Sequence, residues 1–226
     1  MPTSTVEQYI KTIYLQFERL SSDLLPMKQL ADAMEVTPGT ATAMVKHLSQ
    51  LNLVRYLPRK GVSLTDRGRA LALTMVRRHR LIETFLEQVL GYDWGEVHQD
   101  AEQLEHAVSD KFIRRIDAFL GFPDSDPHGD PIPSEKGDIE ASDAVPLNRC
   151  RTGSRIAICR VDNDNQDFLA MMKENLIVPG ELFLLTDQNE IGGTLTITHC
   201  NTNHSCTISI DLSSRIQVRV MPGKVG

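Results

Sequence analysis

The sequence predicts a multidomain α+β protein with an N-terminal winged helix-turn-helix, an all-helical middle domain and a C-terminal small β-barrel. This prediction rests on three observations. Short helical patterns precede a hairpin pattern, two long helical stretches follow, and strand patterns separated by turns come last. A chain of 226 residues has room for several small units. We expect the divisions at residues 1–73, 74–122, 123–146 (a Pro- and acid-rich linker) and 147–226.

The composition fits a folded protein outside the membrane, with 41% hydrophobic and 24% charged residues. No run approaches the roughly 18 apolar residues of a membrane span, and the first eleven residues do not read as a signal peptide. The four cysteines, Cys150, Cys159, Cys200 and Cys206, have no CxxC spacing and are too few for a disulfide scaffold. We therefore expect a cytoplasmic protein without a membrane partner.

The formal net charge of -6 conceals an uneven distribution along the chain. Residues 1–80 hold 12 Lys and Arg against 6 Asp and Glu, whereas residues 81–143 hold 4 against 16. Residues 144–226 are balanced, with 8 of each sign. A basic first part followed by a carboxylate-rich middle favours nucleic-acid binding by the first and cation binding by the second.

The N-terminal elements follow from caps and periodicity. A capping box, Ser4 with Glu7, is expected to open a helix that continues to Leu20. Thr37 before Pro38 predicts an N-cap and a first helical residue. The expected elements are helices over 27–34 and 38–51, then strands over 53–57 and 62–64 around a basic turn.

The later elements are read in the same way. Thr65 is expected to cap a helix that ends before Gly91, and Ser109 to restart a helical region over 96–120. Residues 122–146 are too rich in proline and acid for regular structure. The remaining expected elements are strands over 155–161, 181–185, 193–199 and 206–210, with a helix over 167–175.

The third expected helix has one face suited to a DNA groove. Its apolar residues Met44, Val45, Leu48 and Leu51 share one side, so small and polar side chains occupy the other. A solvated face fits this pattern too, but the preceding short helix, the capped turn and the following basic hairpin together favour DNA binding. The candidate DNA contacts are Thr37, Gly39, Thr40, Thr42, Ala43 and Lys46 on the helix and Arg55, Arg59 and Lys60 on the hairpin.

The middle domain contains a pattern of possible metal ligands. His79 and Glu83 lie four residues apart on one helix, and the next helix carries His98, Glu102, Glu105 and His106 within an arc of about 100° beside its apolar stripe. Imidazole with carboxylate and no thiolate suits Mn²⁺ or Fe²⁺. An exposed charged helix face has the same spacing, so spacing alone leaves both interpretations open.

A second group of possible ligands lies near the C-terminus. His199, Cys200, His204 and Cys206 flank an expected turn. Alternate residues of a hairpin point to opposite faces, so all four side chains do not easily converge on one ion. We therefore favour ordinary packed or exposed hairpin residues over a metal site.

Over essentially its whole length, the chain resembles the diphtheria toxin repressor family of metal-dependent transcriptional regulators. The strongest match is the run VRRHRLIETFL followed by VHQDAEQLEHAVSD, and NLIVPGELFLL with the strands after it is similar to the third domain of the longer members. The resemblance implies a winged-helix DNA-binding domain, a helical dimerisation domain and an SH3-like C-terminal domain.

The resemblance also implies two metal sites. The first holds His79, Glu83 and His98. Asp126-Pro127-His128-Gly129 stands where manganese-sensing members have Cys-Pro-His-Gly, so Asp126 and His128 become candidate ligands. The C-terminal domain of the family can add a carboxylate, for which Asp164 and Asp167 are the nearest matches. The second site comprises Glu102, Glu105 and His106, completed by the first helix through Gln8.

Two departures from the family pattern bear on the metal. Gln8 stands where iron-type members have Met and manganese-type members have Asp, and Lys11 stands at a further acidic position of the manganese type. Glu102 replaces the Cys of iron-type members, and this harder ligand favours Mn²⁺ over Fe²⁺. We expect Mn²⁺ as the effector, Fe²⁺ as the alternative, and Zn²⁺, Co²⁺ or Ni²⁺ as possible substitutes in vitro.

The sequence thus predicts a homodimeric, metal-activated repressor of metal uptake that binds a pseudo-palindromic double-stranded DNA operator. One rival is a metal-dependent hydrolase that uses the His/Glu cluster, but the chain has neither HExxH nor an obvious nucleophile motif. Two others are a DNA-binding regulator with a small organic effector and a scaffold protein without DNA affinity.

Overall fold

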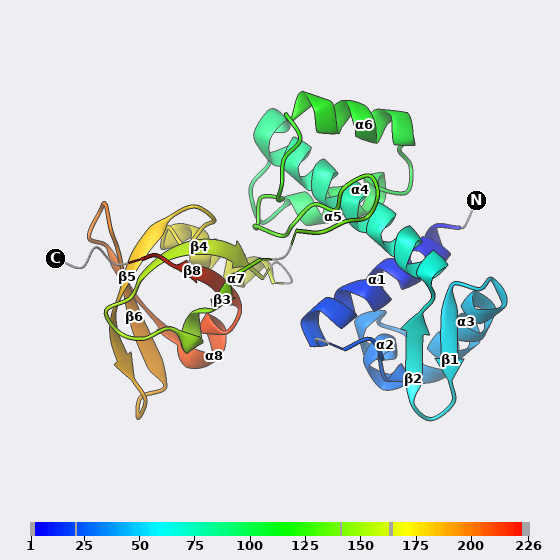
Figure 1. Ribbon diagram of the computed structural model, residues 1–226, viewed down its shortest axis with the longest axis horizontal. Helices are drawn as coiled ribbons and strands as arrows, with labels where there is room; N and C mark the ends of the chain where they lie inside the picture. The colour runs from blue at the N-terminus through cyan, green and yellow to red at the C-terminus, as the bar shows by residue number, and fades with distance from the viewer. Residues whose placement is uncertain (1–2, 21, 141, 163–164, 223–226) are drawn as a thin grey trace. The chain divides into compact units, whose positions relative to one another are not determined.

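The computed structural model describes residues 3–20, 22–140, 142–162 and 165–222 (Figure 1). Its contacts divide the chain into two compact units. The first comprises residues 1–82, 102–118 and 132–139, and the second comprises residues 83–101, 119–131 and 140–226. No helix among the described residues is long and apolar enough to cross a membrane.

The helices and the first hairpin agree closely with the sequence-based prediction. The long helix α4 begins in the first unit and ends in the second. The elements are α1 (Ser4–Leu20), α2 (Met27–Ala33), α3 (Pro38–Gln50), β1 (Val54–Leu57), β2 (Gly61–Leu64), α4 (Asp66–Leu90), α5 (Val97–Leu104) and α6 (Asp110–Phe119).

Side-chain caps fix three of the helix starts as predicted. The hydroxyl oxygen of Thr37 accepts a hydrogen bond from the Thr40 N–H at 3.2 Å, and that of Thr65 accepts one from the Gly68 N–H at 3.0 Å. Ser109 likewise accepts from the Phe112 N–H at 3.2 Å. The predicted capping box of α1 is wrong by one residue: Ser4 is already helical, and the Val6 N–H donates to Thr3 Oγ1 at 3.4 Å.

The core of the first unit joins the helix-turn-helix to its hairpin. Buried side chains of α1, α3, β1, β2 and the start of α4 form one apolar cluster. Leu25 exchanges two 2.9 Å backbone hydrogen bonds with Val62, which ties the hairpin to the segment before α2. A Cβ on Gly61 would lie 2.2 Å from the Leu25 carbonyl oxygen, so only glycine permits this close approach.

Part of the predicted linker is fixed against the first unit. Arg77 of α4 donates to the Pro133 carbonyl oxygen at 2.7 Å and to Asp117 Oδ2 of α6 at 2.6 Å. Ile139 packs on the core of this unit. The described part of residues 122–144 forms no helix or named strand, as predicted, and specific hydrogen bonds hold it in place. The prediction is wrong for the last two residues of the expected linker, Val145–Pro146, which form a short strand.

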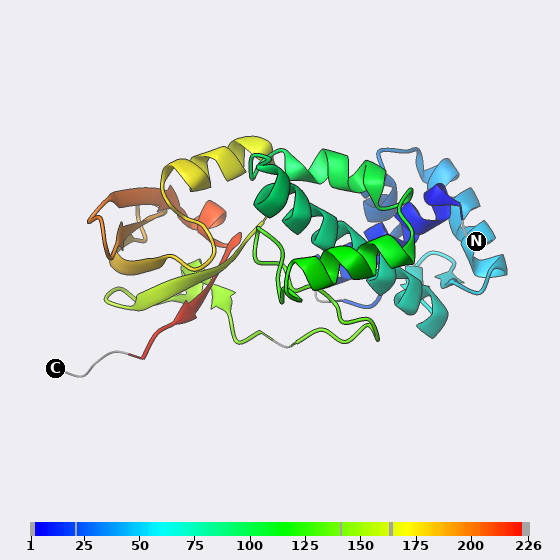
Figure 2. The same ribbon diagram turned by 90° about the horizontal axis from the view of Figure 1, so that it is seen from above.

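The second unit is built on a six-stranded antiparallel sheet with the order β3-β8-β4-β5-β6-β7 (Figure 2). The sheet is open, with β3 and β7 at its ends, so the predicted small barrel is not closed. Four elements here were not predicted: β3, the 3₁₀ turn, α8 and β8. The elements are β3 (Val145–Pro146), a 3₁₀ turn (Leu147–Arg149), β4 (Arg155–Val161), α7 (Gln166–Glu174), β5 (Leu182–Asn189), β6 (Thr194–His199), β7 (Ser205–Ser209), α8 (Ile210–Ser213) and β8 (Ile216–Val220).

The core of the second unit includes a side chain from the helical region. Phe168, Leu169 and Met172 of α7 share one apolar cluster with the inward residues of the sheet and with Trp94. The Trp94 indole N–H donates to the Pro127 carbonyl oxygen at 3.0 Å. Residues 125–131 are thereby held within this unit.

Candidate metal centre and DNA-binding surface

Helices α4 and α5 bring three of the predicted ligands together. His79 and Glu83 lie one helical turn apart on α4, and His98 lies in the first turn of α5. One donor atom from each of the three lies within 4.8 Å of the others. Glu83 is fully buried, and its Oε1 lies 3.1 Å from His98 Nδ1. A buried carboxylate beside two imidazoles is a donor set that fits a divalent cation.

The orientation of His79 is set by a second carboxylate. His79 Nδ1 lies 2.6 Å from Glu105 Oε2, and both side chains are buried. A histidine ligand commonly donates its other ring N–H to a carboxylate, which fixes the ring and the tautomer. With Nδ1 engaged in this way, Nε2 is the nitrogen that can bind an ion.

Glu105 remains ionised although it is fully buried. Burial alone would raise the pKa of its carboxyl, but the hydrogen bond and charge of His79, together with those of Lys11, hold that pKa below the ordinary value. A carboxylate in this state accepts hydrogen bonds from both partners at neutral pH.

The residues predicted for a second site gather around a lysine. Lys11 Nζ lies 2.6 Å from Glu105 Oε1 and 3.6 Å from Glu102 Oε1, and Lys11 is only 3% exposed. The Gln8 amide N–H₂ donates to Glu102 Oε1, and Gln8 Oε1 is buried without a hydrogen-bond partner. The ammonium group of α1 therefore lies against the two carboxylates that were predicted to bind metal.

His106 completes this second cluster. Its Nδ1 lies 2.8 Å from Glu7 Oε2 of α1, and its Nε2 lies 3.4 Å from Glu105 Oε1. Among the described residues, His79, Glu83 and His98 form the single group of mutually close metal-type donors. Sequence reasoning missed the contact of Glu7 with His106, and it identified Lys11 only as a departure from the family pattern, without its pairing with Glu105. The spacing of Glu7 and Lys11, four residues apart on α1, was the available signal.

Asp126 and His128 lie in a tight loop of the second unit, outside that group of three. Asp126 Oδ1 accepts from the His128 N–H at 2.8 Å and from the Asp130 N–H at 3.0 Å. The His128 ring is fully buried, with its centroid 5.0 Å from that of Trp94. A Cβ on Gly129 would lie 1.9 Å from the Cys159 carbonyl oxygen, so glycine lets this loop approach β4.

Asp164 and Asp167 are the remaining candidate ligands from the resemblance. Asp167 is exposed in the first turn of α7, and Asp164 lies outside the described residues. In the C-terminal hairpin, His199 Nε2 lies 2.7 Å from Glu181 Oε2, and its Nδ1 accepts from Thr202. His204 Nε2 lies 3.2 Å from Asn175 Oδ1, so the two imidazoles have separate partners.

The predicted DNA-binding face of α3 is open to solvent. Gly39, Ala43 and Lys46 are exposed, whereas Thr42 is half-buried and its hydroxyl donates to the Pro38 carbonyl oxygen at 2.7 Å. Thr37 and Thr40 are exposed at the start of the helix, and their hydroxyl groups lie 2.9 Å apart. The opposite side buries Ala41, Val45 and Leu48, while Leu51 is 38% exposed rather than in the core.

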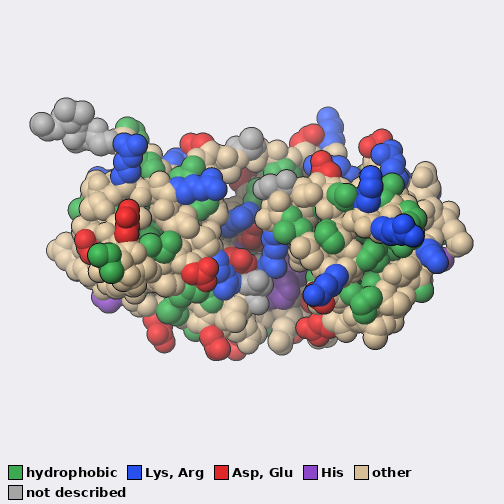
Figure 3. All heavy atoms as spheres, turned by 90° about the horizontal axis from the view of Figure 1, so that it is seen from below, with side chains coloured by type: hydrophobic (Ala, Val, Ile, Leu, Met, Phe, Trp, Pro, Cys, Tyr) green, Lys and Arg blue, Asp and Glu red, His purple; other side chains and the backbone are tan. Residues whose placement is uncertain are grey.

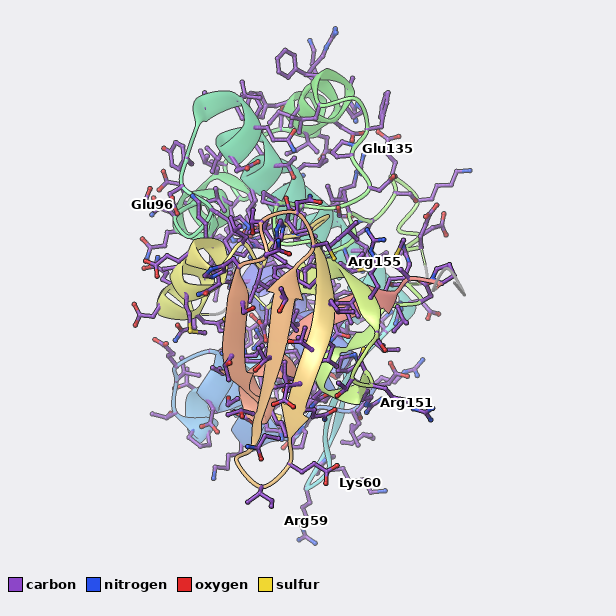
Figure 4. All side chains as sticks on the ribbon, turned by 90° about the vertical axis from the view of Figure 1, so that its left-hand side faces the viewer. Arg59, Lys60, Glu96, Glu135, Arg151 and Arg155 are labelled. Carbon is purple, nitrogen blue, oxygen red and sulfur yellow. The ribbon has the colours of Figure 1, made fainter. Side chains whose placement is uncertain are left out.

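The basic hairpin residues extend from the same unit. Arg55 is exposed on β1, and Arg59 and Lys60 project from the β1–β2 turn (Figure 4). Arg59 adopts a φ of 65°, a left-handed conformation that closes the turn. Figure 3 shows the first unit from the side to which the β1–β2 turn points. Several Lys and Arg side chains gather on this face of the unit. This surface can form electrostatic contacts to a phosphate backbone.

Comparison with known proteins places these features in one family. The model for the iron-dependent repressor N-terminal DNA-binding domain matches residues 1–62, and the model for the iron-dependent repressor metal-binding and dimerisation domain matches residues 65–134. The first range contains the exposed face of α3 and the hairpin as far as Val62. The second contains His79, Glu83 and His98.

Relatives and solved structures agree with these matches. The iron-dependent repressor IdeR of Mycobacterium tuberculosis (strain ATCC 25618 / H37Rv) is 31% identical over an alignment of 208 positions that covers 85% of this chain and 87% of the relative. The diphtheria toxin repressor of Corynebacterium glutamicum is 27% identical over an alignment of 232 positions that covers 97% of each chain.

Among solved structures, a manganese-dependent transcriptional repressor in complex with manganese has a TM-score of 0.88 and 36% identity, covering 96% of this chain and 100% of that chain. ScaR with bound Zn²⁺ has a TM-score of 0.79 and 29% identity, covering 97% and 100%. The chain belongs to the iron-dependent repressor family, that is, the diphtheria toxin repressor family of metal-dependent transcriptional repressors. It is a DNA-binding regulator and not an enzyme.

Proposed function

We propose that this protein is a Mn²⁺-activated repressor of metal uptake, with Fe²⁺ as the alternative effector, and that it binds a pseudo-palindromic operator as a homodimer. The convergence of His79, Glu83 and His98 within 4.8 Å carries the proposal. Two imidazoles and a buried carboxylate without thiolate favour a metal of the Mn²⁺ and Fe²⁺ type. The manganese complex of a similar repressor supports the first choice, and the similarity to IdeR supports the alternative.

The bound ion would supply positive charge that holds the three ligands at one point. Glu83 and His79 would bind from α4, and His98 would bind from α5. Asp126, His128, Asp164 and Asp167 remain candidate additional ligands, and the burial of Asp126 and His128 supports the first two.

The protein's own contacts connect this centre to the DNA-binding helices. His79 contacts Glu105, Glu105 contacts Lys11, and Lys11 lies on α1. The other side of α1 contributes Ile10, Ile13 and Phe17 to the core that also contains Val45 and Leu48 of α3. Fixing the His79 ring would thus restrict α1 and, through the shared core, the helix that enters the groove. A coupling of about 5- to 150-fold in DNA affinity is typical of such switches.

The dimer and the DNA contacts are proposed as follows. Two recognition helices related by a two-fold axis would read two half-sites of one operator. Thr37, Gly39, Thr40, Thr42, Ala43 and Lys46 would face the major groove, while Arg55, Arg59 and Lys60 would contact phosphates or the minor groove.

Fluorescence anisotropy of labelled duplexes tests the proposal. Duplexes from the region upstream of the protein's own gene are titrated at fixed salt with chelator, Mn²⁺, anaerobic Fe²⁺ or Zn²⁺, for the wild type and His98→Ala. We expect tight binding of the wild type with Mn²⁺ and none of this gain in the variant. Equal binding with chelator and with metal would contradict a metal switch, and a stronger response to Fe²⁺ at equal free concentration would select the alternative.

A further inference from the structure

We propose that Lys11 is a built-in cation that occupies the place of a second metal ion, so that each chain binds one effector ion rather than two. This inference rests on the proposed function, because it concerns the number of ions that the regulator senses. The ion pair ties α1 permanently to the end of α5 and the turn after it, where a second metal ion would otherwise make a conditional tie.

Burial and charge carry the argument. Lys11 is 3% exposed, and Glu105, its partner at 2.6 Å, is fully buried. Lysine is almost never buried to this extent unless it is paired, because removing its charge from water is costly. Here the ammonium group has Glu105 and, at 3.6 Å, Glu102 as anionic partners. The two carboxylates are thus balanced by a charge that belongs to the protein.

The surrounding donors have the composition of a metal site. Besides Glu102 and Glu105, His106 places Nε2 3.4 Å from Glu105 Oε1, and Gln8 Oε1 is buried without a hydrogen-bond partner. Two carboxylates, an imidazole and an amide oxygen are ligands that Mn²⁺ accepts. What excludes an ion is the ammonium group, since two cations among the same carboxylates repel one another strongly in a buried environment.

The arrangement also connects the cation to the sensing centre. Glu105 Oε1 accepts a hydrogen bond from the Lys11 ammonium group, and Glu105 Oε2 lies 2.6 Å from His79 Nδ1. The lysine therefore stabilises the carboxylate that orients a ligand of the effector ion. Lys11 acts as a positioning residue, through Glu105, and not as a ligand.

Counting ions per chain tests the proposal. Purified wild type, Lys11→Glu and the control Lys28→Glu, which changes the same charge at an exposed lysine of α2, are equilibrated with saturating Mn²⁺, separated from free ion, and measured by elemental analysis. We expect one Mn²⁺ per chain for the wild type and the control and two for Lys11→Glu. The second ion should be lost again in Lys11→Glu with His106→Ala.

Two ions per wild-type chain, or an unchanged count of one in a folded Lys11→Glu protein, would overturn the proposal. Should Lys11→Glu fail to fold without metal, Lys11→Met removes the ammonium group without adding a charge, and isothermal titration should then reveal a second, weaker Mn²⁺-binding phase. Its absence in folded Lys11→Met would also overturn the proposal. A wild type that binds no Mn²⁺ would instead refute the proposed function. If in that case Lys11→Glu bound one ion, the gain of one ion over the wild type would still support the role of Lys11.

Discussion

Two clusters of histidine and carboxylate side chains differ in what lies at their centre, one on α4 and α5 and the other at the end of α5 and in the turn that follows it. In one, His79, Glu83 and His98 turn their donor atoms toward one another. In the other, Glu102, Glu105 and His106 gather with an ammonium group supplied by α1. The same residue types at the same helical spacing thus form a candidate sensing site in one place and an ionic joint in the other. A single residue, Lys11, makes the difference.

The two clusters also differ in whether their contacts are conditional or permanent. Metal binding at the first cluster would depend on the concentration of the ion. The ion pair in the second cluster depends only on the folded chain, and Glu105 belongs to it while contacting His79 of the first. Variants in the first cluster should therefore change mainly the Mn²⁺ affinity, and variants in the second mainly the free energy of unfolding.

The largest effect is expected from removing the buried carboxylate of the first cluster. Glu83→Gln keeps the shape of the side chain but removes its charge, so Mn²⁺ affinity should fall by at least about 100-fold, beyond the roughly 10- to 100-fold typical of groups behind the ligands. Isothermal titration measures this affinity. Glu87→Gln, one turn further along α4, serves as the control and should bind as the wild type does. Wild-type affinity in Glu83→Gln would remove this residue from the centre.

The second cluster should respond mainly in stability. Lys11→Met leaves Glu105 buried with fewer partners, and breaking a buried ion pair in this way costs about 3 to 5 kcal/mol. Urea unfolding of the metal-free protein should show this decrease in the free energy of unfolding, whereas Lys28→Met should change it by less than about 0.5 kcal/mol. An unchanged midpoint in Lys11→Met would mean that the pair contributes nothing net to the fold.

Glu105 belongs to both clusters, so its variant should affect both quantities moderately. Glu105→Gln loses the charged partner of His79 Nδ1, and Mn²⁺ affinity should fall by about 10- to 100-fold. The folded-state pKa of the Glu105 carboxyl lies below its ordinary value of 4.5, so its ionised form stabilises the protein above that pH, and this contribution disappears as the pH falls through the lowered pKa. The free energy of unfolding of the metal-free variant should therefore decrease less than that of the wild type as the pH falls below about 4.5. If the free energy of unfolding fell equally with pH in Glu105→Gln and in the wild type, the lowered pKa of Glu105 would be contradicted.

The smallest effect concerns the DNA surface, which neither cluster touches. Lys46→Ala should weaken binding to all sequences alike and reduce the slope of log K against log salt by roughly one. Its metal dependence should stay that of the wild type. Anisotropy titrations over a salt series measure the slope, and an unaltered slope would place Lys46 away from the phosphate backbone.

Local chemistry explains which parts of the fold were predictable from the sequence. Thr37, Thr65 and Ser109 cap helices where they stand, because a cap depends on neighbouring residues alone. The start of α1 was misassigned by one residue since Thr3 and Ser4 are both suitable caps. β3 was missed because two residues have no periodicity. Ile216–Val220 was also missed, although its first three residues alternate between buried and half-buried.

The site divides in the same way. The spacing of His79 and Glu83 on one helix shows that they share a face, and the match to His98 required the resemblance to a known family. The partners of Lys11 could not be found by spacing, because 94 residues separate it from Glu105 and only the tertiary fold brings the two together. The open sheet of the second unit is likewise a property of strand pairing that no single strand pattern reveals.

The most direct test of this account is an anomalous difference map from crystals of the Mn²⁺-loaded protein, collected on both sides of the manganese absorption edge. We expect one strong peak per chain among His79, Glu83 and His98, with the Lys11 ammonium group still against Glu105. A second peak between Glu102, Glu105 and His106, or a single peak there with none at the first cluster, would contradict this expectation.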